Sequence, residues 1–333
     1  MEIMKLIIRT ENLSNFEWAK KLIGDNYECN FKSIPEPRNL NASSRNSDDS
    51  FHSLPKKLKD LLKYDKTDFI ISKIKNNIEI PIMSIELTAS APLTQHIEQR
   101  MARMISAAEN GIVPIYICPD YTKSEDREYR FDKKYFNLFE KIGNINKLPC
   151  VLFNFPGNDG VLLMDDNSPG CPDLKSKKMK YLKKFIGEII LESTKDTEPN
   201  FNYFNNNYIN EIFSAQRDLA QGKKYNIDSM GSCEIIKTDT LINFLQSYSE
   251  LDERYLEKFS KSSSFEKILN RQETLIFHVG KTRVLKESRL FNHSGDPYVG
   301  MLAALDYAFC RFGKTTDERK TNLIFIPGNK EDQ

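Results

Sequence analysis

The chain has 333 residues, of which 39% are apolar, and a core of that size needs no disulfides for its stability. Its 48 basic and 47 acidic side chains leave a formal charge of +1, which excludes a protein drawn to nucleic acid by its overall charge, so any basic surface is local. Six cysteines without a C-x-x-C pair argue against a zinc module and a disulfide framework. The N-terminal apolar run is too short for a signal peptide, and no stretch reaches the roughly 20 apolar residues of a transmembrane helix, so we expect a cytoplasmic protein.

The first part of the chain alternates strand and helix patterns. Residues 4–10 predict a strand, and residues 15–23 predict a short helix that ends at Gly24. Residues 34–53 combine Pro, Asn, Ser and Asp, which predicts a loop before a helical segment over residues 54–65. Two interpretations of the loop stay open: a surface excursion, or a segment that orders against a ligand.

Two apolar runs, residues 68–72 and 80–88, predict the strands of an antiparallel hairpin with Lys75-Asn76-Asn77 in its turn. The elements that follow are a helix, a strand, a helix and a strand, over residues 93–110, 112–119, 131–142 and 147–157. This order predicts an α/β fold with a mixed central sheet flanked by helices.

The second half of the chain begins with a lysine-rich amphipathic helix over residues 174–193. Residues 196–233 are rich in Asn, Asp and Gly with weak periodicity, so we place a domain boundary there. The prediction is an α/β core over residues 1–195 and an additional α+β C-terminal lobe over residues 196–333. The lobe's predicted helices and strands cover residues 240–251, 253–260, 273–285, 297–312 and 322–328.

The last helix of the lobe has clear boundaries. Asp296 is its predicted N-cap, Pro297 its first residue and Gly313 its end. Asp306 and Arg311 lie five residues apart on it, a spacing that does not make the i, i+4 ion pair of an α-helix.

The hairpin carries two carboxylates among apolar neighbours, Asp68 and Glu86. In an antiparallel pair they can face each other, and strand alternation puts Ser84, Glu86 and Thr88 on one face. Burying two carboxylates is costly unless a positive group lies between them. Oxygen ligands favour Mg²⁺, which activates water and neutralises the developing charge of a phosphodiester, so the pair predicts metal-assisted hydrolysis.

Asp68, seventeen intervening residues, Glu86-Leu87-Thr88, a helix and a strand resemble the core of the PD-(D/E)XK nuclease superfamily, the fold of type II restriction endonucleases. The resemblance covers roughly residues 60–155 and implies that Asp68 and Glu86 bind the metal. In the family a lysine two positions after the second acid positions the attacking water, and here Thr88 stands there. Because Thr carries no charge, the basic group is expected from Lys73 or from the following helix.

The helix after the hairpin adds polar candidates beside an apolar side made by Ile97, Met101, Met104, Ile105 and Ala108. His96, Arg100 and Arg103 form one flank at i, i+4 and i+7, with Gln95 and Gln99 near the start of the helix. Arginine and glutamine side chains next to an acidic pair suit the binding of a scissile phosphate. We therefore predict Thr88, Gln95, Gln99, Arg100 and Arg103 as further site residues.

Other interpretations of these residues stay open. Glu86 can face solvent on an edge strand, and Asp68 can cap a turn. Arg100 and Arg103 can pair with surface acids such as Glu98. Glu79 is a rival second carboxylate, but strand alternation puts it on the face opposite to Glu86, so the two cannot both be ligands.

Two segments are candidate DNA contacts. The helix over residues 174–193 carries Lys177 and Lys178 within a lysine cluster, which suits sequence-independent phosphate binding. The region before the last helix mixes groups that bind phosphates and read base edges: Lys281, Arg283, Arg289, Asn292 and His293. Solvated helix faces and a capped loop are the plainer interpretations of the two segments.

The resulting hypothesis is a Mg²⁺-dependent endodeoxyribonuclease of the restriction type that acts on double-stranded DNA, and the family resemblance implies a homodimer. One alternative is a catalytically inactive protein of the same fold with a DNA-binding or regulatory role, because the family's lysine is replaced. A nuclease that acts on RNA is the third.

Overall fold

The computed structural model describes residues 4–35, 51, 53–62, 66–88, 94–119, 121–124, 127–130, 133–155, 157–158, 161–195, 233–247, 257–258, 260–279, 297–315 and 318–327. The predicted loop over residues 34–53 lies mostly outside these ranges, as do residues 281–293. The domain boundary drawn within residues 196–233 also falls outside them and stays a prediction.

The protein has a mixed α/β fold built on a six-stranded central sheet with the order β2-β1-β3-β4-β5-β8. The strands in that order are Glu28–Ser33, Lys5–Thr10, Phe69–Lys75, Ile78–Leu87, Val113–Pro119 and Val151–Phe155. β3 runs antiparallel to both of its neighbours, whereas β4, β5 and β8 are parallel to one another. The predicted mixed sheet is confirmed, and the helical connections between β4, β5 and β8 explain why those strands are parallel.

The hairpin of β3 and β4 has the predicted turn. Asn76 and Asn77 have φ angles of 53° and 61°, and Lys75 pairs with Ile78 across them. Two consecutive residues with positive φ make a two-residue hairpin turn of type I′, whose twist matches that of the strands. Asn tolerates this backbone conformation better than most residues, which explains the Asn-Asn sequence.

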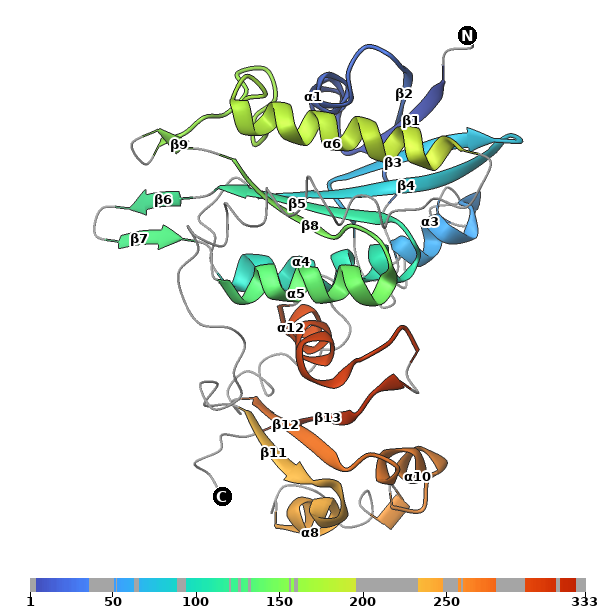
Figure 1. Ribbon diagram of the computed structural model, residues 1–333, viewed down its shortest axis with the longest axis vertical. Helices are drawn as coiled ribbons and strands as arrows, with labels where there is room; N and C mark the ends of the chain where they lie inside the picture. The colour runs from blue at the N-terminus through green and yellow to red at the C-terminus, as the bar shows by residue number, and fades with distance from the viewer. Residues whose placement is uncertain are drawn as a thin grey trace, which may run out of the picture.

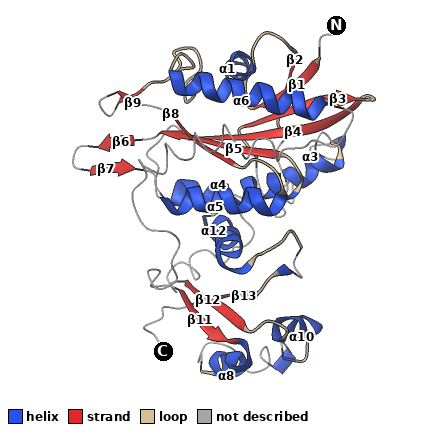
Figure 2. Cartoon of the chain, in the orientation of Figure 1, coloured by secondary structure: helices blue, strands red, loops and turns tan. Residues whose placement is uncertain are grey.

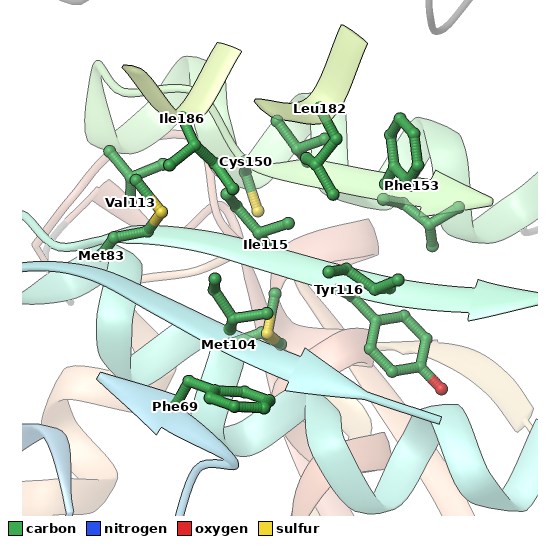
Figure 3. Close-up of a cluster of buried hydrophobic side chains, with 14 of the residues drawn as sticks. Phe69, Met83, Met104, Val113, Ile115, Tyr116, Cys150, Phe153, Leu182 and Ile186 are labelled. Carbon is green, nitrogen blue, oxygen red and sulfur yellow. The ribbon is translucent and has the colours of Figure 1, made fainter. Parts of the chain in front are cut away.

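Helices cover both faces of the central sheet (Figures 1 and 2). α4 (Thr94–Glu109) and α5 (Lys133–Asn146) lie on one face, and α1 (Leu13–Ile23) and α6 (Lys177–Thr194) lie on the other. The predicted apolar side of α4 is buried, from Ile97 to Ala108. Figure 3 shows Leu182 and Ile186 of α6 above β5 and Met104 of α4 below it, so the sheet is packed on both sides.

A second sheet of three strands, in the order β11-β12-β13, lies beyond the layer of α4 and α5. Its strands are Cys233–Lys237, Glu273–Val279 and Thr321–Pro327, and α8 (Leu241–Gln246) and α10 (Ser263–Leu269) flank it. α12 (Pro297–Leu305) lies between this sheet and α4 and packs against α4. The remaining elements are α3 (Lys56–Leu61), the 3₁₀ turn Thr238–Thr240, the β6–β7 pair (Tyr121–Ser124, Arg127–Arg130) and the β9–β10 pair (Gly157–Asn158, Val161–Leu162).

The prediction for the last helix was wrong in its second half. The α-helix stops at Leu305 and continues as a π-helix, η4 (Asp306–Cys310), so the helical segment ends before Gly313. The backbone N–H of Arg311 donates to the Asp306 carbonyl at 2.8 Å, and their side chains pair at 2.8 Å. A π-helix stacks residues i and i+5, which explains how residues too far apart for an α-helical pair come together.

Two predictions from composition can be compared with the described chain. All six cysteines are in the described part of the chain, none of them forms a disulfide, and every one except Cys29 is buried. In the part of the chain that the structure describes, no helix has the length and apolar character needed to cross a membrane.

Candidate active site at the end of the β3–β4 hairpin

The structure brings Asp68 and Glu86 together, as the hairpin prediction required. Phe69 pairs with Ile85 in the antiparallel ladder, so Asp68, just before β3, lies next to the end of β4, and its charge acts on Glu86. The backbone N–H of Leu87 donates to Asp68 Oδ2 at 2.6 Å, which holds the Asp68 carboxylate at the start of β3. The charges of Arg100 and Arg103 on α4 lower the pKa of both carboxyl groups, so both acids lie within reach of these arginines.

Glu86 is fully buried, with 0% of its surface exposed, so the solvent-facing interpretation is wrong. Arg103 Nη1 donates to Glu86 Oε2 at 3.0 Å, and Arg100 Nε lies 3.7 Å from the same oxygen. The other oxygen, Oε1, has no hydrogen-bond donor within the described parts of the chain. The Thr67 hydroxyl bonds to Ser84 and to the Ile85 carbonyl and lies close enough to Glu86 to lower its pKa.

Burial dominates the electrostatics of the pair. The pKa of Glu86 is raised to about 8, mainly by loss of solvent and also by the negative charge of Asp68, against the lowering effect of Arg103 and Arg100. Burial also raises the pKa of Asp68, against the hydrogen bond from Leu87 and the charges of the two arginines. A buried carboxyl group keeps its proton near neutral pH because the positive charge around it is too small to stabilise the carboxylate form. A bound cation supplies that positive charge.

Tyr116 is a site residue that the sequence analysis did not identify. It pairs with Glu86 in the β4–β5 ladder, so the two side chains leave the same face of the sheet. Its side chain is buried, which raises the pKa of the phenol, and its ring stacks on Phe139 with the centroids 6.5 Å apart. The one sign of Tyr116 in the sequence is that a tyrosine stands among the mostly aliphatic residues of the predicted strand over residues 112–119.

Thr88, at the position of the family's lysine, is buried and follows the end of β4. Its backbone N–H donates to the Ile117 carbonyl at 2.9 Å, which extends the contact between β4 and β5. The Thr88 hydroxyl lowers the pKa of Tyr116, so these two side chains lie close together. The position therefore contributes an uncharged hydroxyl beside the carboxylate pair.

Lys73 does not supply the missing basic group, and that prediction was wrong. It lies five positions along β3 from Asp68, about 17 Å at the usual strand rise, and its ammonium donates to the Ser193 carbonyl at the end of α6. Arg100 and Arg103 are instead the described cations that contact Glu86.

The rival carboxylate, Glu79, belongs to a different interaction. Arg9 Nε and Nη2 donate to its two oxygens at 2.7 and 2.8 Å, and Lys32 Nζ lies 3.3 Å away. These partners hold the pKa of Glu79 below its ordinary value despite burial. A two-point pair with arginine explains this carboxylate as structural, at the far end of β4 from Glu86.

Several predicted residues cannot be placed at the site. The side chains of Gln95, His96, Gln99 and Lys177 lie outside the described part of the chain, as do Lys281, Arg283, Arg289, Asn292 and His293. Lys178 lies on α6, across the sheet from Glu86, so the structure does not bring it to the carboxylate pair.

The donor set is small for a metal centre. No group of three or more His, Cys, Asp or Glu side chains suited to a metal occurs among the residues the structure describes. Two carboxylates nevertheless fit Mg²⁺, which keeps several waters and uses one or two protein carboxylates together with substrate phosphates. The buried Oε1 of Glu86, without a donor among the described residues, is an oxygen suited to that role.

Comparison with known proteins found no matching family model, no matching curated protein and no matching solved structure.

Proposed function

We propose that the protein is a Mg²⁺-dependent endodeoxyribonuclease of the restriction type, with Asp68 and Glu86 as its metal ligands. The observation that carries the proposal is Glu86, a completely buried carboxylate beside Asp68 with one oxygen that no described residue satisfies. A buried oxygen without a hydrogen-bond donor is costly to keep, because its loss of contact with water is not compensated, so its presence points to a functional use.

The topology around the pair supports the proposal. β1, β3 and β4 form an antiparallel series, α4 crosses over, and β5 returns parallel to β4. This is the arrangement of strands and helix that the resemblance to PD-(D/E)XK nucleases implies around its two acids. The restriction-endonuclease-like core is part of the proposal.

Each site residue has a defined role in the proposed reaction. Mg²⁺, when bound, lowers the pKa of a water and neutralises charge on the phosphate. Asp68 and Glu86 hold it, with Leu87 fixing the orientation of Asp68 through its backbone N–H. Arg100 and Arg103 give up their contact with Glu86 and bind the phosphate, since guanidinium groups pair well with phosphate oxygens.

DNA binding and assembly belong to the same proposal. Lys177 and Lys178 on α6 and residues 281–293 are the proposed DNA contacts, and a homodimer gives one site for each strand of double-stranded DNA. The proposed location is the cytoplasm.

A second candidate is a catalytically inactive DNA-binding or regulatory protein of the same fold. Two observations favour it: Thr88 brings no charge to the lysine position, and Arg103 already neutralises part of the Glu86 charge. In that case the arginine is a permanent partner of the acid, and no metal is needed.

Plasmid cleavage in Mg²⁺ separates the candidates. We expect the wild-type protein to cut and Glu86→Gln to lose more than about 100-fold in rate, since even groups that orient metal ligands contribute about 10–100-fold. Glu257→Gln, which changes an exposed acid paired with Lys261, is the matched control and keeps the wild-type rate. Intact plasmid with retained DNA binding in a mobility-shift assay supports the second candidate. If the protein degrades RNA but not DNA, its substrate is RNA.

A further inference from the structure

A cavity of about 390 Å³ lies between α4, α12 with η4, and the second sheet. Its walls come from segments far apart in the sequence, including Ile105 on α4, Ile268 on α10, Leu302 on α12 and Leu323 on β13. It shares no lining residue with the Asp68 and Glu86 site. The volume is in the range of pockets that hold small molecules and is too small for a folded partner or a duplex.

The polar part of the lining is rich in guanidinium groups. Three arginines line the cavity, Arg271, Arg311 and Arg319, together with two acids, Glu109 and Asp306. The side chain of Glu109 is half-buried, at 32% exposure, and that of Asp306 is largely buried, at 12%. Both acids pair with Arg311. The lining therefore carries more positive than negative groups.

Two of the arginines are held in place with donors to spare. Arg319 uses Nε and Nη2 on the two oxygens of Asp306, both at 2.8 Å. Arg311 uses Nε on Asp306 and Nη1 on Glu109 and on the Tyr307 hydroxyl. A guanidinium has five N–H donors, so Nη1 of Arg319 and Nη2 of Arg311 remain without an acceptor among the described residues.

The π-helix creates this arrangement. Its wide turn stacks Arg311 on Asp306 and puts Tyr307 beside Glu109 of α4, with the Tyr307 hydroxyl donating to Glu109 Oε1 at 3.0 Å. Such π-helical turns are rare and often occur at functional sites. The guanidinium groups are thus oriented before any ligand arrives, which lowers the entropic cost of binding.

The rest of the lining is largely apolar. Ala102 and Ile105 of α4 and Leu302 and Ala303 of α12 face the cavity together with Leu323. A ligand that fills the cavity therefore combines an acidic group with an apolar body. A bare inorganic anion leaves this wall unused.

We propose that the cavity binds a small organic anion, with one carboxylate or phosphate group against Arg311 and Arg319 and an apolar body against the wall of α4 and α12. The inference goes beyond the proposed nuclease function and does not depend on it, because no residue of the carboxylate pair takes part.

The test uses three probes: benzoate, phenyl phosphate and the uncharged benzyl alcohol. We expect both anions to bind in calorimetric titrations and to raise the melting temperature by roughly 2 °C at ten times the dissociation constant. Benzyl alcohol, which has the apolar body without the charge, binds at least about tenfold more weakly, since a hydrogen bond to a charged group contributes that much.

Variants locate the binding. Arg319→Gln removes one guanidinium, and Ala303→Phe fills the cavity without changing its charge, so each weakens anion binding by about tenfold or more. Lys320→Gln is the matched control, since it removes a neighbouring exposed charge outside the cavity lining and leaves binding unchanged.

A measurement on the wild-type protein covers the case in which a variant does not fold. In methyl-resolved NMR, benzoate is expected to shift the methyl signals of Ile105, Leu302 and Leu323 together, with one dissociation constant. Shifts elsewhere only, no saturable binding of either anion, or equal binding of benzoate and benzyl alcohol overturns the proposal.

Discussion

Glu86 shows how strongly burial controls the chemistry of a single residue. Its neighbours in β4 are apolar, and the sequence predicted which face it occupies but not how completely it is buried. The degree of burial depends on α4 lying over that face, with Arg103 and Arg100 reaching the carboxylate. Long-range packing of this kind leaves no local trace in a sequence, so the raised pKa was not predictable.

The pKa of Glu86 makes the stability of the metal-free protein depend on pH. The folded group holds its proton up to about pH 8, whereas an unfolded Glu loses it near pH 4.3. Between these values the folded state binds more protons, so the free energy of unfolding decreases as the pH rises. In this pH range, we expect the free energy of unfolding of the wild-type protein to fall by up to about 1.4 kcal/mol per pH unit relative to that of Glu86→Gln.

Urea unfolding at a series of pH values between 5 and 8, in the presence of a chelator, measures this difference. The Glu257→Gln variant changes an exposed acid and serves as the control, with the same pH dependence as wild type. Parallel stability curves for wild type and Glu86→Gln would show that the Glu86 carboxyl ionises normally in the folded protein.

At the level of elements, the β3–β4 hairpin depends on its two-residue turn. Asn77 has a φ of 61°, a conformation that costs a β-branched residue about 1–2 kcal/mol and costs Gly nothing. We expect Asn77→Val to lower the free energy of unfolding by about that amount and Asn77→Gly to keep or raise it. Denaturant unfolding of the two variants checks the order, and equal stabilities would contradict the turn assignment.

The elements that the sequence predicted well are those with a strong local signal. β1, β3, β4, β5 and β8 carry buried apolar runs, and the turn at Asn76-Asn77 has its own residue preference. β2 was missed because most of its residues are exposed and polar, and it is a strand only through its pairing with β1. The π-helix η4 was missed because its sequence is compatible with an α-helix. Asp306 in this turn pairs with Arg311 and with Arg319, and the sequence pattern of a helix does not show these contacts.

The candidate site was predictable only in part. The hairpin pattern was sufficient to predict that the two strands pair, but the register set by the turn would put Asp68 opposite Ile85. A register shift between Ile71 and Ser72, which no local pattern announced, brings Asp68 next to Glu86. The position of Arg103 beside Glu86 followed from helical spacing together with the packing of α4. Tyr116 needed the β4–β5 register, which no local pattern specifies, since parallel strands are joined through a long connection.

At the scale of the whole molecule, α12 and η4 connect the two sheets. The Tyr307 hydroxyl joins η4 to α4 through Glu109 and to α5 through the Asn146 amide, at 3.0 and 3.1 Å. The residue is 1% exposed and packs in the main core. Segments that share a core unfold together, so we expect a single cooperative unfolding transition for the two sheets.

Removing the Tyr307 hydroxyl tests this coupling. Tyr307→Phe removes the hydrogen bonds of the hydroxyl with Glu109, Asn146 and Arg311, so we expect the free energy of unfolding to fall by about 1–3 kcal/mol with the transition still single. Calorimetry gives the overall transition, and the fluorescence of Trp18, the chain's one tryptophan, reports the packing of α1 against Phe69 of the central sheet. Tyr181→Phe is the control, because that ring lies on the exposed side of α6. If the two sheets were independent, calorimetry would resolve two transitions, and Tyr307→Phe would leave the midpoint of the Trp18 transition unchanged.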